Sequence, residues 1–269
     1  MASEGIKFLD TGSNNGKFNM AVDYYIARHM LDKPTFRVYR WDPYCVSLGY
    51  HQELSEIDAE LCKARGFDIV RRETGGRAVF HSEELTYSMV IPKGSNFYSD
   101  SILEVYNKIS TVLVNALKAS GVKEADLKKG KAPDFKELYK EKLSSVCFSS
   151  TSTYEVVIGD KKLVGSAQKR LKESVLQHGS IIVGKKHLEL IDLLNIEDRL
   201  KRRFKEITKS KTATVGEIIE INDHNAFYNT LKNELKNSLA VEFGETVEEI
   251  SLNKKDLLEI NEIESYFNL

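Results

Sequence analysis

Apolar residues along this chain recur at two spacings, one typical of helices and one typical of strands. Phe18, Val22 and Ile26 lie four positions apart and predict a helix over residues 18–30. Short apolar runs rich in β-branched and aromatic residues predict strands at 36–39, 45–48, 67–70, 85–91, 154–158, 162–164 and 175–183.

Polar residues and glycines mark where two further helices should begin and end. Ser55 is the expected cap of one helix, and Gly66 is its expected end. Asp100 or Ser101 is the expected cap of a longer helix, which Gly121 ends. The first half of the chain therefore alternates helices with strands.

The rest of the sequence predicts a larger part with both helices and strands and a smaller part that is mainly helical. Gly159-Asp160 joins two predicted strands as a tight hairpin, so the sheet is at least partly antiparallel. Residues 123–144 are rich in lysine and lack periodicity, which predicts a mobile loop. We predict an α+β fold in which helices flank a mixed, largely antiparallel β-sheet. Residues 1–210 form its main domain, and residues 211–269 form a small, mainly helical C-terminal extension. Within this extension, Thr214, with Glu217 three residues later, is the expected cap of a helix.

Composition limits the classes of protein that this chain can belong to. Its 269 residues, 41% of them hydrophobic, suffice for one sizeable core. No apolar run approaches the roughly 20 residues of a membrane span, and no signal-peptide pattern occurs, so we expect a cytoplasmic protein without a membrane partner. Three cysteines are an odd number, and no Cys-x-x-Cys or His-x-x-x-His spacing occurs, so we expect neither a disulfide framework nor a metal site. A monomer is the default expectation.

Positive charge is concentrated between Arg199 and Lys211. This segment holds seven cations and one acid, so its net charge is +6 and the rest of the chain must carry −7 to reach the total of −1. Such a strip fits an acidic protein, a nucleic acid or an ordinary solvated helix face. It lacks the aromatic interleaving that stacking on single strands requires, so no nucleic-acid partner is expected.

The stretch from Arg71 to Ser88 is the most informative part of the sequence. It reads Arg-Arg-Glu-Thr-Gly-Gly-Arg-Ala-Val-Phe-His over residues 71–81 and Glu-Leu-Thr-Tyr-Ser over residues 84–88. Gly75 and Gly76 fall between two predicted strands, where the absence of side chains lets backbone N–H groups approach a ligand closely. We interpret this block as a binding loop.

A thiol and a lysine lie on either side of the predicted hairpin. Cys147 precedes it among serines, and Lys162 lies on its return strand. A neighbouring ammonium would raise the thiolate fraction of Cys147 and make it a competent nucleophile. Cys45 falls in an apolar strand and Cys62 on an amphipathic helix, so both are expected in the core.

Together these motifs resemble the biotin and lipoate ligase and transferase superfamily. The resemblance spans residues 18 to about 210 and rests on the glycine block, Cys147-Phe148, Lys162-x-x-Gly165-Ser166-Ala167-Gln168-x-Arg170 and Gln177-His178-Gly179-Ser180-Ile181. Within the superfamily, the chain is most similar to cysteine-dependent octanoyl-acyl-carrier-protein:protein N-octanoyltransferases. The resemblance implies the catalytic-domain fold of class II biotin and lipoyl synthetases over residues 1–210.

The resemblance also implies a mechanism in which Cys147 and Lys162 are catalytic. Cys147 would accept the octanoyl group of octanoyl-acyl carrier protein and pass it to a lysine of a lipoyl domain or of the glycine-cleavage H protein, without a cofactor or ATP. Lys162 would stabilise the thiolate and the oxyanion, and neutral Lys162, His81 or His178 would take the proton of the acceptor lysine. The implied substrate-binding residues are Arg71, Arg72, Thr74, Gly75, Gly76, Arg77, Ala78, His81, Tyr87, Gly165, Ser166, Ala167, His178 and Gly179.

Two other functions remain as alternatives. An ATP-dependent lipoate-protein ligase, which acts through an acyl-adenylate, shares a close version of the glycine block but needs no thiol. A non-catalytic nucleic-acid binder would use the basic segment. In the leading hypothesis, that segment docks acidic partner proteins, residues 123–144 form a lid, and Arg71 or Arg72 contacts the phosphopantetheine phosphate.

Overall fold

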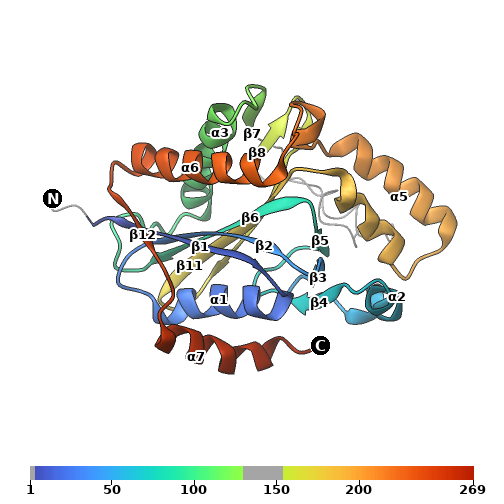
Figure 1. Ribbon diagram of the computed structural model, residues 1–269, viewed down its shortest axis with the longest axis horizontal. Helices are drawn as coiled ribbons and strands as arrows, with labels where there is room; N and C mark the ends of the chain where they lie inside the picture. The colour runs from blue at the N-terminus through green and yellow to red at the C-terminus, as the bar shows by residue number, and fades with distance from the viewer. Residues whose placement is uncertain (1–3, 130–153) are drawn as a thin grey trace.

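A six-stranded sheet forms the centre of the computed structural model, which describes residues 4–129 and 154–269 (Figure 1). Its strand order is β10-β11-β6-β2-β1-β12. The first three neighbouring pairs are antiparallel and the last two are parallel, so the predicted mixed, largely antiparallel sheet is confirmed. The strands are β1 (Ile6–Asn14), β2 (Thr35–Trp41), β6 (Glu84–Pro92), β10 (Val164–Arg170), β11 (Ser174–Ile182) and β12 (Val247–Ile250).

Helices cover both faces of this sheet (Figure 1). On one face, α3 (Ile102–Ala119) and α6 (His224–Phe243) enclose the largest hydrophobic cluster. On the other face, α1 (Gly16–His29) and α7 (Lys254–Ile263) enclose a second cluster, and the short turn η6 (Glu264–Phe267) follows α7. The predicted helix over residues 18–30 and the cap at Ser101, which accepts a hydrogen bond from the Glu104 N–H, are both confirmed.

A second, three-stranded sheet has the order β4-β3-β5 and its own hydrophobic cluster. Its strands are β3 (Cys45–Leu48), β4 (Asp68–Arg71) and β5 (Val79–His81). The elements η1 (Leu54–Glu56), α2 (Ala59–Ala64), η4 (Lys185–Leu193) and α5 (Asp198–Lys211) surround it. This sheet carries the glycine block, because the block connects β4 to β5 and then to β6.

The third sheet corrects the loop predicted over residues 123–144. Residues Ala125–Lys129 form β7, which pairs antiparallel with β8 (Tyr154–Ile158), so this part of the lysine-rich segment is a strand. Lysine-rich composition did not prevent strand formation, because β8 supplies the backbone hydrogen bonds. Residues 130–144, and with them the rest of the predicted lid, lie outside the described residues.

The hairpin at Gly159-Asp160 is confirmed, but its return strand is shorter than predicted. β9 comprises only Lys161–Lys162 and pairs with β8. After Leu163 the chain joins the central sheet as β10. Lys162 and the Gly165-Ser166-Ala167 segment therefore belong to different sheets.

Two helix starts also differ from the prediction. Ser55 lies in η1, and α2 begins after Asp58, whose carboxylate accepts a hydrogen bond from the Leu61 N–H. The capping box of Thr214 and Glu217 is present, but it opens only a single 3-10 turn, η5 (Val215–Glu217). A cap determines where a helix can start, whereas its length depends on apolar packing further along.

Residues 211–269 join the sheet and cores of the preceding residues. The segment is mainly helical, as predicted, but it also contains β12, which extends the central sheet by pairing in parallel with β1. Its helix α6 packs against α3, and α7 packs against α1. Along the described ranges, no helix combines the length and the apolar character needed to cross a membrane.

Candidate functional site

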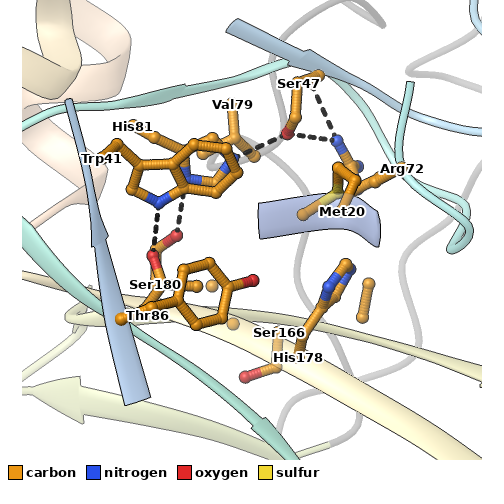
Figure 2. A pocket seen from close by; sticks show the side chains of 14 residues that line it. Met20, Trp41, Ser47, Arg72, Val79, His81, Thr86, Ser166, His178 and Ser180 are labelled. Carbon is orange, nitrogen blue, oxygen red and sulfur yellow. Dashed lines mark hydrogen bonds between the residues drawn. The ribbon is translucent and has the colours of Figure 1, made fainter. Parts of the chain in front are cut away.

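A pocket lies where the central sheet meets the second sheet (Figure 2). Its volume is about 370 Å³, including its mouth. Met20 of α1 reaches into it, while Ser47, Val79 and His81 line it from the second sheet. The central sheet supplies Tyr39, Trp41, Thr86, Gly165, Ser166, Ala167, His178, Gly179 and Ser180, and Arg72 completes the wall.

One wall of the pocket is a hydrogen-bonded chain around His81. Its Nδ1 lies 2.7 Å from Oε1 of Glu84, and its Nε2 lies 2.7 Å from Oγ of Ser47. The ring stacks on Trp41 with centroids 4.0 Å apart. Glu84 is 3% exposed. Burial raises its pKa, but the neighbouring His81 and hydroxyl hydrogen bonds outweigh burial and leave the pKa below its ordinary value.

The Glu84 carboxylate accepts two more hydrogen bonds, both from hydroxyl groups of the central sheet. Thr86 Oγ1 donates at 2.6 Å and Ser180 Oγ donates at 2.7 Å. Thr86 Oγ1 in turn accepts the indole N–H of Trp41 at 2.7 Å. This chain of bonds fixes the orientation of every polar side chain on this wall.

The opposite wall is a second chain around His178. Its Nδ1 lies 3.3 Å from Oδ2 of Asp23, and its Nε2 lies 2.6 Å from Oγ1 of Thr74, which belongs to the glycine block. Burial lowers the pKa of His178, against the opposing effect of Asp23, so the ring is neutral near pH 7. Neutral His178 therefore joins α1 to the glycine block.

Asp23 is the centre of this second chain. Arg37 Nη1 donates to its Oδ1 at 2.7 Å, and Tyr39 and Ser88 donate hydroxyl hydrogen bonds. Burial alone would raise the pKa of Asp23, but Arg37 and His178 overcome it and lower the pKa to about 2. Arg37 is 0% exposed, and its remaining donors bind Asn19 and Thr11. The pair is a buried, fully hydrogen-bonded salt bridge.

Arg71 and Arg72, one of which was predicted to contact a phosphate, bind backbone carbonyls. Arg72 donates to the carbonyls of Ser47, Gly75 and Arg77 and so sets the shape of the glycine block. Arg71 donates to the carbonyls of Gly49 and Gln52. Both guanidinium groups therefore have a structural role in the described residues.

Gly75 and Gly76 lie at the surface of the block, close to a third glycine. Gly76 has φ +95°, a conformation that favours glycine, and the carbonyl of Gly76 packs directly against Gly49. A Cβ at Gly49 would overlap that carbonyl, whereas a Cβ at Gly75 would meet nothing within 4 Å. The close backbone approach thus depends on Gly49, which the sequence analysis did not select.

The remaining predicted binding residues divide between the pocket and its surroundings. Gly165, Ser166, Ala167 and Gly179 line the pocket. Tyr87 instead packs in the core beneath α3 and α6, where its hydroxyl lies 2.8 Å from Ser166 Oγ. Arg77 and Ala78 do not line the pocket, and Ala78 is buried in the core of the second sheet.

Lys162 is buried at the strand end that leads into the pocket. Its Nζ lies 3.0 Å from Oε1 of Glu155 on β8, and both side chains are less than a tenth exposed. β10 follows Lys162 by two residues and carries the pocket-lining Gly165. The ammonium is therefore held in a fixed position by a carboxylate.

Cys147 lies outside the described residues, and the other two cysteines are buried. Burial raises the pKa of Cys45 well above its ordinary value, and burial together with Asp58 raises the pKa of Cys62 to about 11. Such thiols are almost entirely protonated near neutral pH and are poor nucleophiles. In residues 4–129 and 154–269, no three His, Cys, Asp or Glu side chains gather as a metal site requires.

The sequence analysis did not select several polar residues that line or support the pocket, among them Asp23, Arg37, Ser47 and Glu84. A charged residue on the buried side of an apolar helix or strand is a usable signal, and Asp23 and Arg37 both show it. Ser47 has no such signal, because a serine within a short strand is ordinary. Only its contact with His81 distinguishes it.

Comparison with known proteins matches most of the chain to one family. The family model described as "Lipoyl protein ligase A/B catalytic domain" matches residues 15–240. A protein named octanoyltransferase LipM from Staphylococcus epidermidis is 35% identical and covers 97% of this chain and 95% of the relative. LipM of Kyrpidia tusciae is 41% identical over 74% of this chain and 76% of the relative.

Solved structures with the same fold are lipoate-protein ligases. Lipoate-protein ligase A bound with ATP superposes with a TM-score of 0.74 at 22% identity, covering 97% of this chain and 94% of the other. A bipartite lipoate protein ligase from Thermoplasma acidophilum gives a TM-score of 0.76 at 22% identity, covering 98% and 92%. At this identity the likeness concerns the fold, whereas the Staphylococcus epidermidis relative matches in sequence over nearly the full length. The chain belongs to the lipoyl protein ligase A/B catalytic domain family, within its octanoyltransferase LipM branch.

Proposed function

We propose that this protein transfers an octanoyl group from the thioester of an acyl carrier protein to a lysine of a lipoyl domain or of the glycine-cleavage H protein. The observation that carries the proposal is the 35% identity to an octanoyltransferase along 97% of the chain. The pocket supports it, because small and apolar side chains such as Met20, Gly165 and Ala167 line it between two hydrogen-bonded walls.

The chemistry proceeds through a thioester on Cys147. The Cys147 thiolate attacks the carbonyl carbon of the donor thioester, and the carrier's thiolate leaves and takes up a proton. The neutral amine of the acceptor lysine then attacks the enzyme thioester, forms an amide bond and loses a proton, while the Cys147 thiolate leaves. The second step runs from a thioester to an amide and is downhill, so neither ATP nor another cofactor is required.

Lys162 supplies fixed positive charge near the reacting carbonyl. Glu155 holds its ammonium at 3.0 Å, at the strand end that continues into Gly165 of the pocket wall. A cation fixed before the reaction stabilises an oxyanion without the cost of reorganising. His178 and His81 both have their ring nitrogens occupied by hydrogen bonds, so either one accepts the lysine proton only after a hydroxyl partner moves.

The acyl chain itself contributes to binding. Six methylenes and a methyl beyond the carbonyl contribute about 5 kcal/mol at about 0.8 kcal/mol per group if the pocket buries them fully. Met20 lies inside the pocket. Its side chain is apolar and flexible, whereas hydrogen bonds hold the polar side chains of the two walls in place. The chain therefore packs against Met20 and against the small residues of β10.

The decisive experiment incubates the enzyme with octanoyl-acyl carrier protein in the absence of ATP and measures its intact mass. We expect one octanoyl adduct, which Cys147→Ala abolishes. Cys62→Ala is the matched control, because its thiol has a raised pKa and should leave the adduct in place. An adduct that survives Cys147→Ala would reject the proposed nucleophile. Transfer that requires octanoate and ATP would instead identify a ligase.

The basic helix α5 provides a docking surface for the acidic partner proteins. Its exposed side includes Arg199, Arg202 and Lys209, while Phe204 and Thr208 are buried against the protein. Charge reversal at Arg202 and Lys209 should raise the KM for the carrier protein and weaken its dependence on salt. The same reversal at Lys118, on α3, is the control. Unchanged KM values at low salt would remove α5 from the docking surface.

A further inference from the structure

Three side chains in the pocket have the arrangement of a Ser-His-acid triad. Ser47 Oγ lies 2.7 Å from Nε2 of His81, and Nδ1 of His81 lies 2.7 Å from Oε1 of Glu84. A nucleophile bonded to a base, which is oriented by a carboxylate, defines such a triad by geometry rather than by sequence position. We propose that Ser47, His81 and Glu84 form a second acyl-transfer centre, which hydrolyses medium-chain acyl thioesters without Cys147.

The direction of each hydrogen bond supports this proposal. An ionised carboxylate only accepts, so Nδ1 of His81 donates to Glu84, and in the neutral ring with this tautomer Nε2 accepts from Ser47. Arg72 Nη1 donates to Ser47 Oγ at 3.2 Å. Because a guanidinium has no acceptor, the Ser47 hydroxyl proton does not point to Arg72 and remains available to His81. This is the protonation state that a general base needs.

The triad is rigid and faces the pocket. Trp41 stacks on the His81 ring, while Thr86 and Ser180 hold the carboxylate of Glu84. Ser47 and His81 line the cavity and lie on neighbouring strands, paired antiparallel as Cys45↔His81 and Ser47↔Val79 (Figure 2). Structural buried serines need no histidine partner, as Ser174 shows by donating to the carbonyl of Ala27.

The chemistry balances without any additional reagent. Ser47 Oγ attacks the thioester carbonyl while His81 Nε2 takes the hydroxyl proton, and the leaving thiolate then receives that proton. Water attacks the resulting ester, gives a proton to His81 Nε2, and Ser47 Oγ leaves with that proton as the carboxylic acid is released. The guanidinium of Arg72, beside Ser47 Oγ, provides positive charge next to the tetrahedral intermediate.

The substrate class of this activity rests on the proposed function, whereas the activity itself goes beyond that function. The test therefore uses the Cys147→Ala background, in which the proposed transfer is absent. We expect Cys147→Ala to release octanoate slowly from octanoyl-acyl carrier protein, and a second substitution, Ser47→Ala, to lower that rate by about a hundredfold. Ser174→Ala in the same background is the control and should retain the rate.

A second measurement detects the nucleophile directly and does not require a Ser47 variant to fold. An octyl fluorophosphonate should label the Cys147→Ala protein once, on the peptide that contains Ser47, and His81→Asn should slow the labelling by about a hundredfold. Absence of hydrolysis above the blank, hydrolysis that survives Ser47→Ala, or label on another serine would each overturn the proposal. Octanoyl transfer that persists in the Cys147→Ala protein, with the label on Ser47, would overturn only the proposed Cys147 function.

Discussion

The two histidines of the pocket are each paired with a buried carboxylate, but the two pairs differ in what surrounds them. Glu84 is held by His81 and by neutral hydroxyls, and its chain ends at Ser47 on the pocket wall. Asp23 is held by the guanidinium of Arg37, and its chain ends at Thr74 in the glycine block.

The difference separates a chemical role from a structural one. The salt bridge between Asp23 and the buried guanidinium stabilises the fold, because removing either charge leaves the other buried without a partner. Among the described residues, no lysine or arginine forms a salt bridge with Glu84, so its charge acts mainly on the His81 ring. The same pair, a carboxylate beside an imidazole, therefore stabilises the fold at Asp23 and acts on the His81 ring at Glu84.

The largest expected effect follows from breaking the Asp23 pair. Asp23→Ala leaves Arg37 buried without a carboxylate, so the free energy of unfolding should fall by about 3–5 kcal/mol. Glu84→Gln keeps an acceptor for neutral donors and should cost about 1–2 kcal/mol. Equilibrium denaturation with urea measures both values. Asp32→Ala, which removes the exposed pair with Lys7, is the control and should cost less than about 1 kcal/mol. Equal costs at Asp23 and Glu84 would contradict the comparison.

Lowering the pH should cause a smaller loss of folding stability. The folded pKa of Asp23 is about 2 against an ordinary value of 3.8, so the ionised form contributes about 2 kcal/mol of stability. Because the folded pKa is the lower one, this contribution is present above about pH 4 and is lost as the pH falls toward 2.

The titration of His178 should also lower folding stability as the pH falls, but at a higher pH than that of Asp23. Its folded pKa is also lowered by burial, so the unfolded chain takes up the proton first and stability falls below about pH 6.5. Buried His187 has the same sign. Denaturation midpoints measured from pH 7.5 to 3 should fall in two stages, first through His178 and then through Asp23. His178→Gln should reduce the first fall. The same loss between pH 7 and pH 5 in that variant would exclude His178 as its source.

The smallest effect should appear in turnover. Thr74→Val keeps the size of the side chain but removes the hydroxyl that bonds His178, so the glycine block is held less firmly. We expect kcat/KM for octanoyl transfer to fall by about tenfold, with little change in the thermal midpoint. Thr111→Val, which removes a hydroxyl bonded to the carbonyl of Asn107 on α3, is the control. An unaltered kcat/KM would show that this contact does not position the block.

Much of the fold could be predicted because its signals are local. The helix over residues 18–30, the Ser101 cap and the Gly159-Asp160 hairpin each depend on residues within a few positions of one another. The strand β12 could not be predicted in this way. It has only four residues, and its partner β1 lies at the other end of the chain.

The candidate site shows the same limit. The glycine block identified the region, but the roles of its arginines depended on carbonyls that only folding brings near. Tyr87 lies within the same motif as His81, but it follows the pocket-lining Thr86 on β6, so strand alternation points it to the other face of the central sheet. Spacing in a motif does not reveal which of its side chains face the pocket.

By itself, the sequence determined the α+β class, most helices and strands and the superfamily, and it led to the hypothesis that Cys147 is the nucleophile. Those conclusions rest on short-range periodicity and on motifs that remain contiguous along the chain. Only the tertiary structure decided which polar side chains meet, because Ser47 and His81 are 34 residues apart and Asp23 and His178 are 155 apart. Hydrogen bonds act over about 3 Å, so their partners are determined by how the sheets pack and not by position in the chain.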